Sequence, residues 1–184
     1  MPPGLHLAEP LNPAPMEINW LVQIGAALVP MVIGFIWYNP KVFGNAWMNA
    51  AGMTEEKAKS GNMPLIFGSS FLFALLLSFA YAVFADHWNA FQAFFRPVVE
   101  HGMGIDPTTS FGAELKGYID AYGERYSSWT HGLAHGLIMS IVVVLPIMVT
   151  NALFERKSFK YIAINWGYWA VTLTTMFMVV AQFG

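Results

Sequence analysis

Cysteine is absent from this 184-residue sequence, and charged residues are few. Without a thiol the chain forms no disulfide, no thiolate metal site and no cysteine nucleophile. Charged residues make up 11% of the sequence, roughly half of the usual share in soluble domains, whereas hydrophobic residues make up 56%. The formal net charge of -2 argues against the basic surface that nucleic-acid binding requires. The composition therefore predicts a membrane protein with no nucleic-acid partner.

Long uncharged runs predict four membrane-spanning helices. Each run holds the ~20 apolar residues that cross about 30 Å of hydrocarbon. A helix also satisfies its own backbone hydrogen bonds, which lipid cannot do. We predict an all-α integral membrane protein, a single domain over 1–184 in which four transmembrane helices form a bundle, with spans at 18–38, 64–85, 129–154 and 161–183.

The nine lysine and arginine residues predict the orientation, because such residues are retained on the cytoplasmic side. The tail 1–17 has none, and the connection 86–128 has three. Two short links are basic: 39–63 contains Lys41, Lys57 and Lys59, and the link between the third and fourth spans contains Arg156, Lys157 and Lys160. We therefore predict that both termini and 86–128 are non-cytoplasmic and that 39–63 is cytoplasmic. The location that we predict for the protein is the inner (plasma) membrane of a bacterium.

The two segments outside the bilayer have amphipathic patterns. In the link 39–63, Asn39-Pro40 stops the first span, Phe43, Trp47 and Met48 suit a short helix on the membrane surface, and Thr54 is typical of a helix start. The connection 86–128 predicts two short amphipathic helices, whose apolar positions are Trp88, Phe91, Phe94 and Phe95, then Leu115, Tyr118, Ile119 and Tyr122. These helices either cap the bundle or form a docking surface for another subunit.

Two histidines lie four positions apart in the third predicted span, in "THGLAHGLIMS" at 130–140. Residues at this spacing share one face of a helix, so His131 and His135 are candidate ligands for one metal ion or haem. They are also candidates for a proton-responsive or polar-substrate site. The third interpretation is structural: each imidazole needs only a hydrogen bond to a neighbouring helix. None of the four spans contains an Asp or Glu that could complete a metal site, and we predict no cofactor.

Small residues beside the histidines predict close helix packing. Gly132 and Gly136 form a G-x-x-x-G pair, which Ser140 extends. Amides in the other spans supply further polar candidates. Asn19 and Gln23 enter the first span at the depth of the histidines, whereas Asn151 and Asn165 lie toward the cytoplasmic ends of the third and fourth. Pro30 and Pro146 each lie within a span, where a proline either kinks the helix or is simply tolerated.

Several motifs along most of the chain resemble one known family. They are "INW" at 18–20, "WYNP" at 37–40, "FGNAWM" at 43–48, "GMTEE" at 52–56, "HGLAHG" at 131–136, "NALFERK" at 151–157 and "INWGYW" at 164–169. With these motifs the chain resembles the domain-of-unknown-function 1761 family of small membrane proteins. The resemblance implies a four-helix integral membrane protein, and it supplies no substrate and no catalytic residue.

The sequence contains no nucleophile–base–acid set, no phosphate-binding glycine loop and no paired carboxylates, so it argues against an enzyme. Besides a metal or haem protein that uses the histidine pair, two functions remain open. The first is an accessory or assembly subunit of a larger membrane complex, whose partners are lipid and other subunits or copies of itself. The second is a small oligomeric transporter or channel-like protein with a polar path lined by His131, His135, Asn19, Gln23, Asn151 and Asn165.

Overall fold

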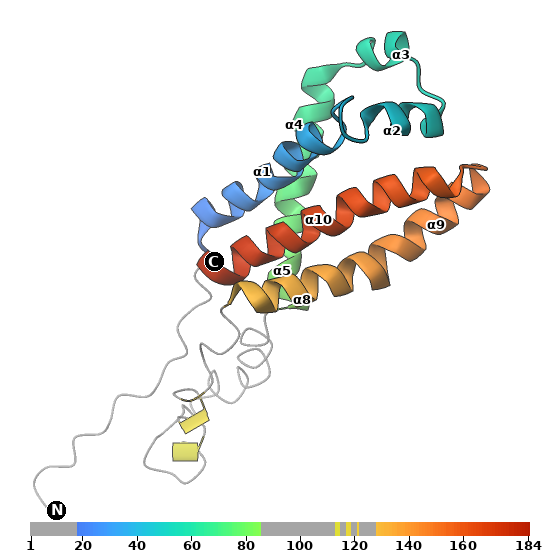
Figure 1. Ribbon diagram of the computed structural model, residues 1–184. Helices are drawn as coiled ribbons and strands as arrows, with labels where there is room; N and C mark the ends of the chain where they lie inside the picture. The colour runs from blue at the N-terminus through green and yellow to red at the C-terminus, as the bar shows by residue number, and fades with distance from the viewer. Residues whose placement is uncertain (1–17, 86–112, 115–116, 119–120, 122–127) are drawn as a thin grey trace, which may run out of the picture. The chain divides into compact units, whose positions relative to one another are not determined.

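The computed structural model describes residues 18–85, 113–114, 117–118, 121 and 128–184, and their regular secondary structure is entirely helical. Contacts divide the chain into two units: Met1–Ile18 with Asp86–Ser127, and Asn19–Ala85 with Ser128–Gly184. The second unit contains all of the helices described below (Figure 1). That the whole chain forms one membrane domain stays a prediction.

The first unit is described at few positions. Ala113, Glu114, Gly117, Tyr118 and Ala121 are helical. The predicted tail 1–17 and the rest of the two predicted amphipathic helices within 86–128 lie outside the described residues. Their roles as a cap or a docking surface therefore stay predictions.

Three helical stretches of the second unit are long and apolar enough to cross a membrane. They correspond to the first, third and fourth predicted spans. A polar residue caps each start: the side chains of Asn19, Ser128 and Ser158 accept hydrogen bonds from backbone amides of the first turn. The stretches are α1 (Trp20–Trp37), the continuous series α8 (Trp129–Met139), η1 (Ser140–Val144) and α9 (Leu145–Phe154), and α10 (Phe159–Phe183).

The second predicted span, 64–85, is divided in the structure. Helix α4 (Met63–Ser78) has 16 residues, and the short helix α5 (Ala80–Phe84) follows it. At the junction the buried Ser78 hydroxyl donates to the Leu75 carbonyl over 2.7 Å. That carbonyl is also the acceptor that a continuing α-helix would offer to the Phe79 amide. The fourth apolar helix is shorter than the sequence predicts.

Helix α10 is the central element of this unit. It contacts α1, α2, α4, α5, α8, η1 and α9. In Figure 1, α1 lies along α10 on one side and the α8–α9 series on the other. The fully buried side chains of Leu173, Met176 and Phe177 belong to α10 and form the middle of the apolar core. Both neighbours run antiparallel to α10, because Asn19 bonds to Phe183 and Trp37 to Ile164, whereas Gly132 lies against Phe177 and Ser140 bonds to Trp166.

The third stretch changes its helical geometry before Pro146. Residues Ser140–Val144 form one wide π-helical turn, in which the Leu145 amide donates to the Ser140 carbonyl. Proline has no amide hydrogen, so the ladder is already interrupted at the next residue. The departure from α-helix occurs where Pro146 predicts a kink. At Pro30 in α1 the helix continues, and the Tyr168 hydroxyl donates to the Pro30 carbonyl over 3.0 Å.

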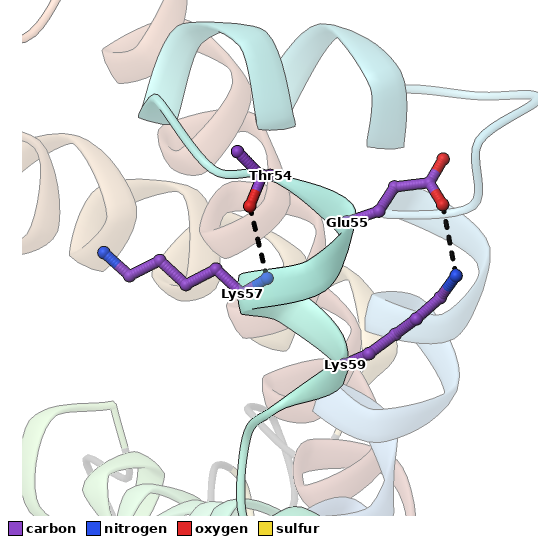
Figure 2. Close-up of polar contacts among 4 residues, drawn as sticks. All are labelled: Thr54, Glu55, Lys57 and Lys59. Carbon is purple, nitrogen blue, oxygen red and sulfur yellow. Dashed lines mark hydrogen bonds and ion pairs between the residues drawn. The ribbon is translucent and has the colours of Figure 1, made fainter.

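Two short helices follow α1. Helix α2 (Gly44–Ala51) lies where Phe43, Trp47 and Met48 predict a short helix, and its C-cap is the left-handed Gly52. Helix α3 (Glu55–Lys59) begins after Thr54, whose hydroxyl accepts a hydrogen bond from the Lys57 amide. Figure 2 shows this cap together with the exposed ion pair between Lys59 Nζ and Glu55 Oε2, 3.1 Å apart. Both contacts lie within α3 and its N-terminal cap. An exposed ion pair of this kind contributes little to stability.

Candidate functional site

Glycines hold α8 directly against the backbone of α10. A Cβ atom at Gly132 would lie 2.3 Å from the Phe177 carbonyl oxygen, and one at Gly136 would lie 2.4 Å from Thr174 Cα. Both distances are shorter than van der Waals contact, so only glycine fits at this crossing. The small residues predicted to pack helices therefore lie within the chain, between α8 and α10.

The histidine pair lies beside this crossing, at the start of α8. The ring centroids of His131 and His135 are 4.4 Å apart. His131 Nε2 lies 2.9 Å from the Ala85 carbonyl oxygen, so the imidazole donates to this acceptor and carries its proton on Nε2. Ala85 follows α5, where carbonyl groups no longer have partners within the helix. His131 therefore joins α8 to the end of α5.

A buried aromatic residue completes the surroundings of His131. The ring of Tyr81, in α5, meets the His131 ring edge-on at 6.5 Å and the Phe177 ring at 5.6 Å. Tyr81 is buried in the core. Across the described residues, no group of three or more His, Cys, Asp or Glu side chains converges as a metal site. The two imidazoles thus lie together, with the Tyr81 ring as an aromatic neighbour of His131.

The predicted amides of α1 have different roles. Asn19 Nδ2 donates to the Phe183 carbonyl over 3.1 Å, so it joins the start of α1 to the end of α10. At the same end the Gln182 side chain accepts a hydrogen bond from the Trp129 amide, which joins α10 to the start of α8. Gln23 is only 5% exposed, and its Oε1 accepts no hydrogen bond from the residues that the structure describes. Gln23 is therefore a buried acceptor available to a donor.

Ser140 and Trp166 join the π-helical turn to α10. Ser140 is fully buried, and its carbonyl accepts a hydrogen bond from Trp166 Nε1 over 3.0 Å. The same carbonyl accepts the Leu145 amide within the π-turn. The Trp166 indole thus binds α10 to the first residue of the π-helical turn.

The densest polar cluster surrounds Asn165, near the start of α10. Its Oδ1 accepts hydrogen bonds from the Tyr38 hydroxyl at 3.0 Å and from Trp47 Nε1 at 3.2 Å. Its Nδ2 donates to the Tyr161 carbonyl at 2.8 Å. One amide therefore joins the end of α1 and helix α2 to α10, and we call Tyr38, Trp47 and Asn165 the asparagine cluster.

Further contacts reinforce the asparagine cluster. Trp37 Nε1 donates to the Ile164 carbonyl over 3.1 Å, and the Tyr38 and Trp47 rings meet edge-on at 5.4 Å. Lys157 Nζ donates to the Ala51 carbonyl over 2.9 Å, which fastens the end of α2 to the α9–α10 link. A Cβ at Gly44 would lie 2.3 Å from the Tyr38 carbonyl oxygen, so α2 starts directly against the end of α1.

Asn151 is placed differently from the other amides. It lies in α9 within the third candidate span, it is exposed, and no hydrogen bond between described residues joins it to Asn165. The sequence predicts Asn151 and Asn165 for one polar path, and the described hydrogen bonds do not join them. Asn165 faces its own chain, whereas Asn151 faces outward.

The aromatic donors of these clusters are not among the site residues predicted from the sequence. Trp47 is predicted only for a short helix on the membrane surface, and Trp37 and Tyr38 only as part of the "WYNP" motif, whereas each donates a hydrogen bond to α10. A buried tyrosine or tryptophan needs a polar partner. The need of Tyr38 and Trp47 for an acceptor, together with Asn165 in the "INWGYW" motif, is therefore the feature of the sequence that could have indicated this cluster.

Comparison with known proteins gives one match. Residues 21–181 match the family described as "Protein of unknown function (DUF1761)". This range contains the three candidate spans, the glycine crossing and the asparagine cluster, apart from the first residue of α1 and the last residues of α10. No curated protein and no solved structure matches the chain. The chain belongs to the DUF1761 family, as its motifs predict.

Proposed function

We propose that the protein crosses the membrane four times and serves as an accessory or assembly subunit of a larger membrane complex. Helices α4 and α5 together form the second crossing in this proposal. The basic links 39–63 and 155–160 then lie in the cytoplasm, and both termini lie on the non-cytoplasmic side of a bacterial inner membrane. The antiparallel course of α1 and α8–α9 against α10 fits this arrangement.

The observation that carries the proposal is the outward-facing Asn151. Ile147 and Phe154 share its helical face, and they are 57% and 86% exposed. An amide on this face has either lipid or another protein beside it. The hydrocarbon part of lipid offers a primary amide no hydrogen-bond partner, whereas a helix of another subunit or copy does. We therefore assign the part of this face around Ile147 and Asn151 to contact with another membrane helix, and Phe154 lies beyond it at the end of α9.

The other polar side chains support a scaffold. His131, Asn19 and Asn165 each bond to a neighbouring helix of the same chain. These hydrogen bonds stabilise the unit internally, so its outer face is held in a fixed shape to which a partner can bind.

The proposal is tested by substituting Asn151 while the chain remains in its own membranes. Asn151→Leu keeps the size of the side chain and removes its amide. Asn49→Leu is the matched control, because Asn49 is an exposed asparagine of α2 outside the candidate spans. Native mass spectrometry after gentle extraction should show partner polypeptides, or further copies, at fixed stoichiometry on the wild type and on Asn49→Leu, and their loss from Asn151→Leu. Equal retention by both variants contradicts the proposal.

The alternative function, a transporter with a polar path, is supported by one observation. Gln23 is a buried acceptor without a described donor, and it lies in the same half of the molecule as the histidines. Replacing His131 and His135 together by Gln distinguishes the two functions. A subunit keeps its assembly, whereas a proton-conducting path loses proton flux into phosphatidylcholine vesicles that report internal pH with a dye. Flux by the wild type that the double variant lacks favours the transporter.

A further inference from the structure

The α9–α10 link contains an unusual backbone conformation. Among the described residues, Gly52 at φ 70° and Arg156 at φ 57° have left-handed backbones. Gly52 is the residue type that this conformation favours, whereas a side chain there costs about 1–2 kcal/mol. Arg156 follows the end of α9, where the Lys157 amide donates to the Ala152 carbonyl and the Arg156 amide to the Leu153 carbonyl. This is the usual pattern in which glycine ends a helix.

A side chain retained at such a position needs a compensating interaction. The described contacts of Arg156 are backbone hydrogen bonds, and its side chain is exposed. Lys160, in the first turn of α10, is also exposed. Lys157 is different, because its amine donates to Ala51 and lies 5.5 Å from the Tyr161 ring centroid. Arg156 and Lys160 are therefore the two cations of the link available to a ligand outside the chain.

Large apolar side chains lie beside these cations. Phe154 is 86% exposed and Phe159 is 83% exposed, the two highest values among the exposed large hydrophobic residues. The link thus has exposed phenylalanines at the ends of two membrane-length helices, with Arg156 between them in the sequence and Lys160 directly after Phe159. This combination matches the boundary of a bilayer, where acyl chains meet phosphate groups.

We propose that the α9–α10 link is a binding site for an anionic phospholipid. The Arg156 guanidinium, supported by Lys160, binds the phosphate group, and Phe154 and Phe159 contact the acyl chains. Arginine suits this role because its planar fork forms two parallel hydrogen bonds to phosphate oxygens. Glu155 is the acidic neighbour in the link, so three cations face one anion over residues 155–160 and an anionic headgroup is favoured over a zwitterionic one. This inference rests on the membrane insertion proposed above.

The test measures lipid retained by the full-length protein in nanodiscs that contain equal amounts of phosphatidylglycerol and phosphatidylcholine. Native mass spectrometry then counts each lipid on the released protein. Arg156→Gly removes the cation from a backbone that glycine favours, so the variant folds. Arg156→Lys keeps the charge without the fork. Lys57→Gln removes one charge from an exposed position of α3 on the same predicted side of the membrane.

We expect the wild type to retain phosphatidylglycerol selectively, and Arg156→Gly to retain it about fivefold more weakly, as removal of one cation near a membrane surface implies. Arg156→Lys should fall between the two, and Lys57→Gln should match the wild type. Equal loss in Arg156→Gly and Lys57→Gln, or equal retention of both lipids by the wild type, would overturn the lipid site while membrane insertion stands. A wild-type protein that does not enter nanodiscs at all would instead contradict the proposed four-span topology.

Discussion

The two ends of α10 are joined to their neighbours by different physical means. Toward its C-terminal end, α8 lies on α10 with glycine against backbone, at Gly132 and Gly136. Toward its N-terminal end, α1 and α2 reach α10 through the aromatic donors of the asparagine cluster, which converge on one amide. The first contact depends on the absence of side chains, and the second depends on particular side chains.

This difference predicts how each end responds to substitution. A glycine crossing tolerates no added atom, because backbone cannot move aside as a side chain can. A hydrogen-bonded cluster tolerates changes that keep its donors paired, and it loses stability when a buried donor is left without an acceptor. The substitutions below test this comparison, from the largest expected effect to the smallest.

The largest effect should come from Gly136→Ala. The added Cβ would lie 2.4 Å from Thr174 Cα, so α8 must move away from α10. We expect a loss of about 3 kcal/mol in the free energy of unfolding, measured in mixed detergent micelles. Gly25→Ala in α1 is the matched control, because its Cβ would meet nothing within 4 Å, and it should change stability by at most about 1 kcal/mol. Equal losses of stability in Gly136→Ala and Gly25→Ala would contradict the claim that α8 and α10 are held together by glycine-to-backbone contact.

Asn165→Leu should have the next largest effect. It leaves the Tyr38 hydroxyl and the Trp47 indole without their acceptor, at a cost of about 2–3 kcal/mol. Tyr38→Phe removes one donor and keeps the amide paired with Trp47, so it should cost about 1 kcal/mol. The rate of proteolytic cleavage within 39–63 measures whether α2 has been released from α10. If Asn165→Leu leaves cleavage there unchanged, the asparagine cluster does not hold α2.

His131→Phe tests whether the imidazole joins α8 to α5. The variant keeps an aromatic ring beside Tyr81 but removes the donor to the Ala85 carbonyl, so we expect a loss of about 1–2 kcal/mol. His131→Gln retains a donor in the side chain and should recover part of this loss. Indistinguishable stability of the wild type and His131→Phe would contradict the structural role of His131.

The smallest effects concern the two left-handed residues. Arg156→Gly should raise the free energy of unfolding by about 1 kcal/mol, because glycine adopts this conformation without a Cβ penalty. Gly52→Ala should lower it by a similar amount, since the position has open space and only the backbone is strained. Both are measured in detergent without added anionic lipid. Opposite signs support the backbone assignment, and the same sign would contradict it.

Much of the fold is predictable because hydrocarbon thickness imposes helix length. The first, third and fourth spans follow from uncharged runs, whereas their exact starts are set by the caps Asn19, Ser128 and Ser158, which the hydropathy pattern does not identify. The break after Ser78, where the serine hydroxyl donates to the Leu75 carbonyl, is not predictable from hydropathy. Contacts between residues far apart in the sequence are likewise not predictable from it. The sequence contains Trp47 and Asn165 as separate residues, and only the fold brings them within 3.2 Å of each other.

The site residues show the same limit. The G-x-x-x-G spacing identifies Gly132 and Gly136 as packing residues, but not α10 as their partner. The i, i+4 spacing predicts that His131 and His135 share a face, and their rings are 4.4 Å apart. Whether an amide faces its own chain, as Asn165 does, or outward, as Asn151 does, depends on the rotation of each helix about its axis. Short sequence patterns do not fix that rotation.

The measurement that most directly tests the central claim is native mass spectrometry of the wild-type protein after gentle extraction from its own membranes. A subunit whose α9 contacts another membrane helix through Asn151 should appear with additional polypeptides, or further copies, at fixed stoichiometry. A single chain that carries lipid alone under the same conditions would contradict the claim.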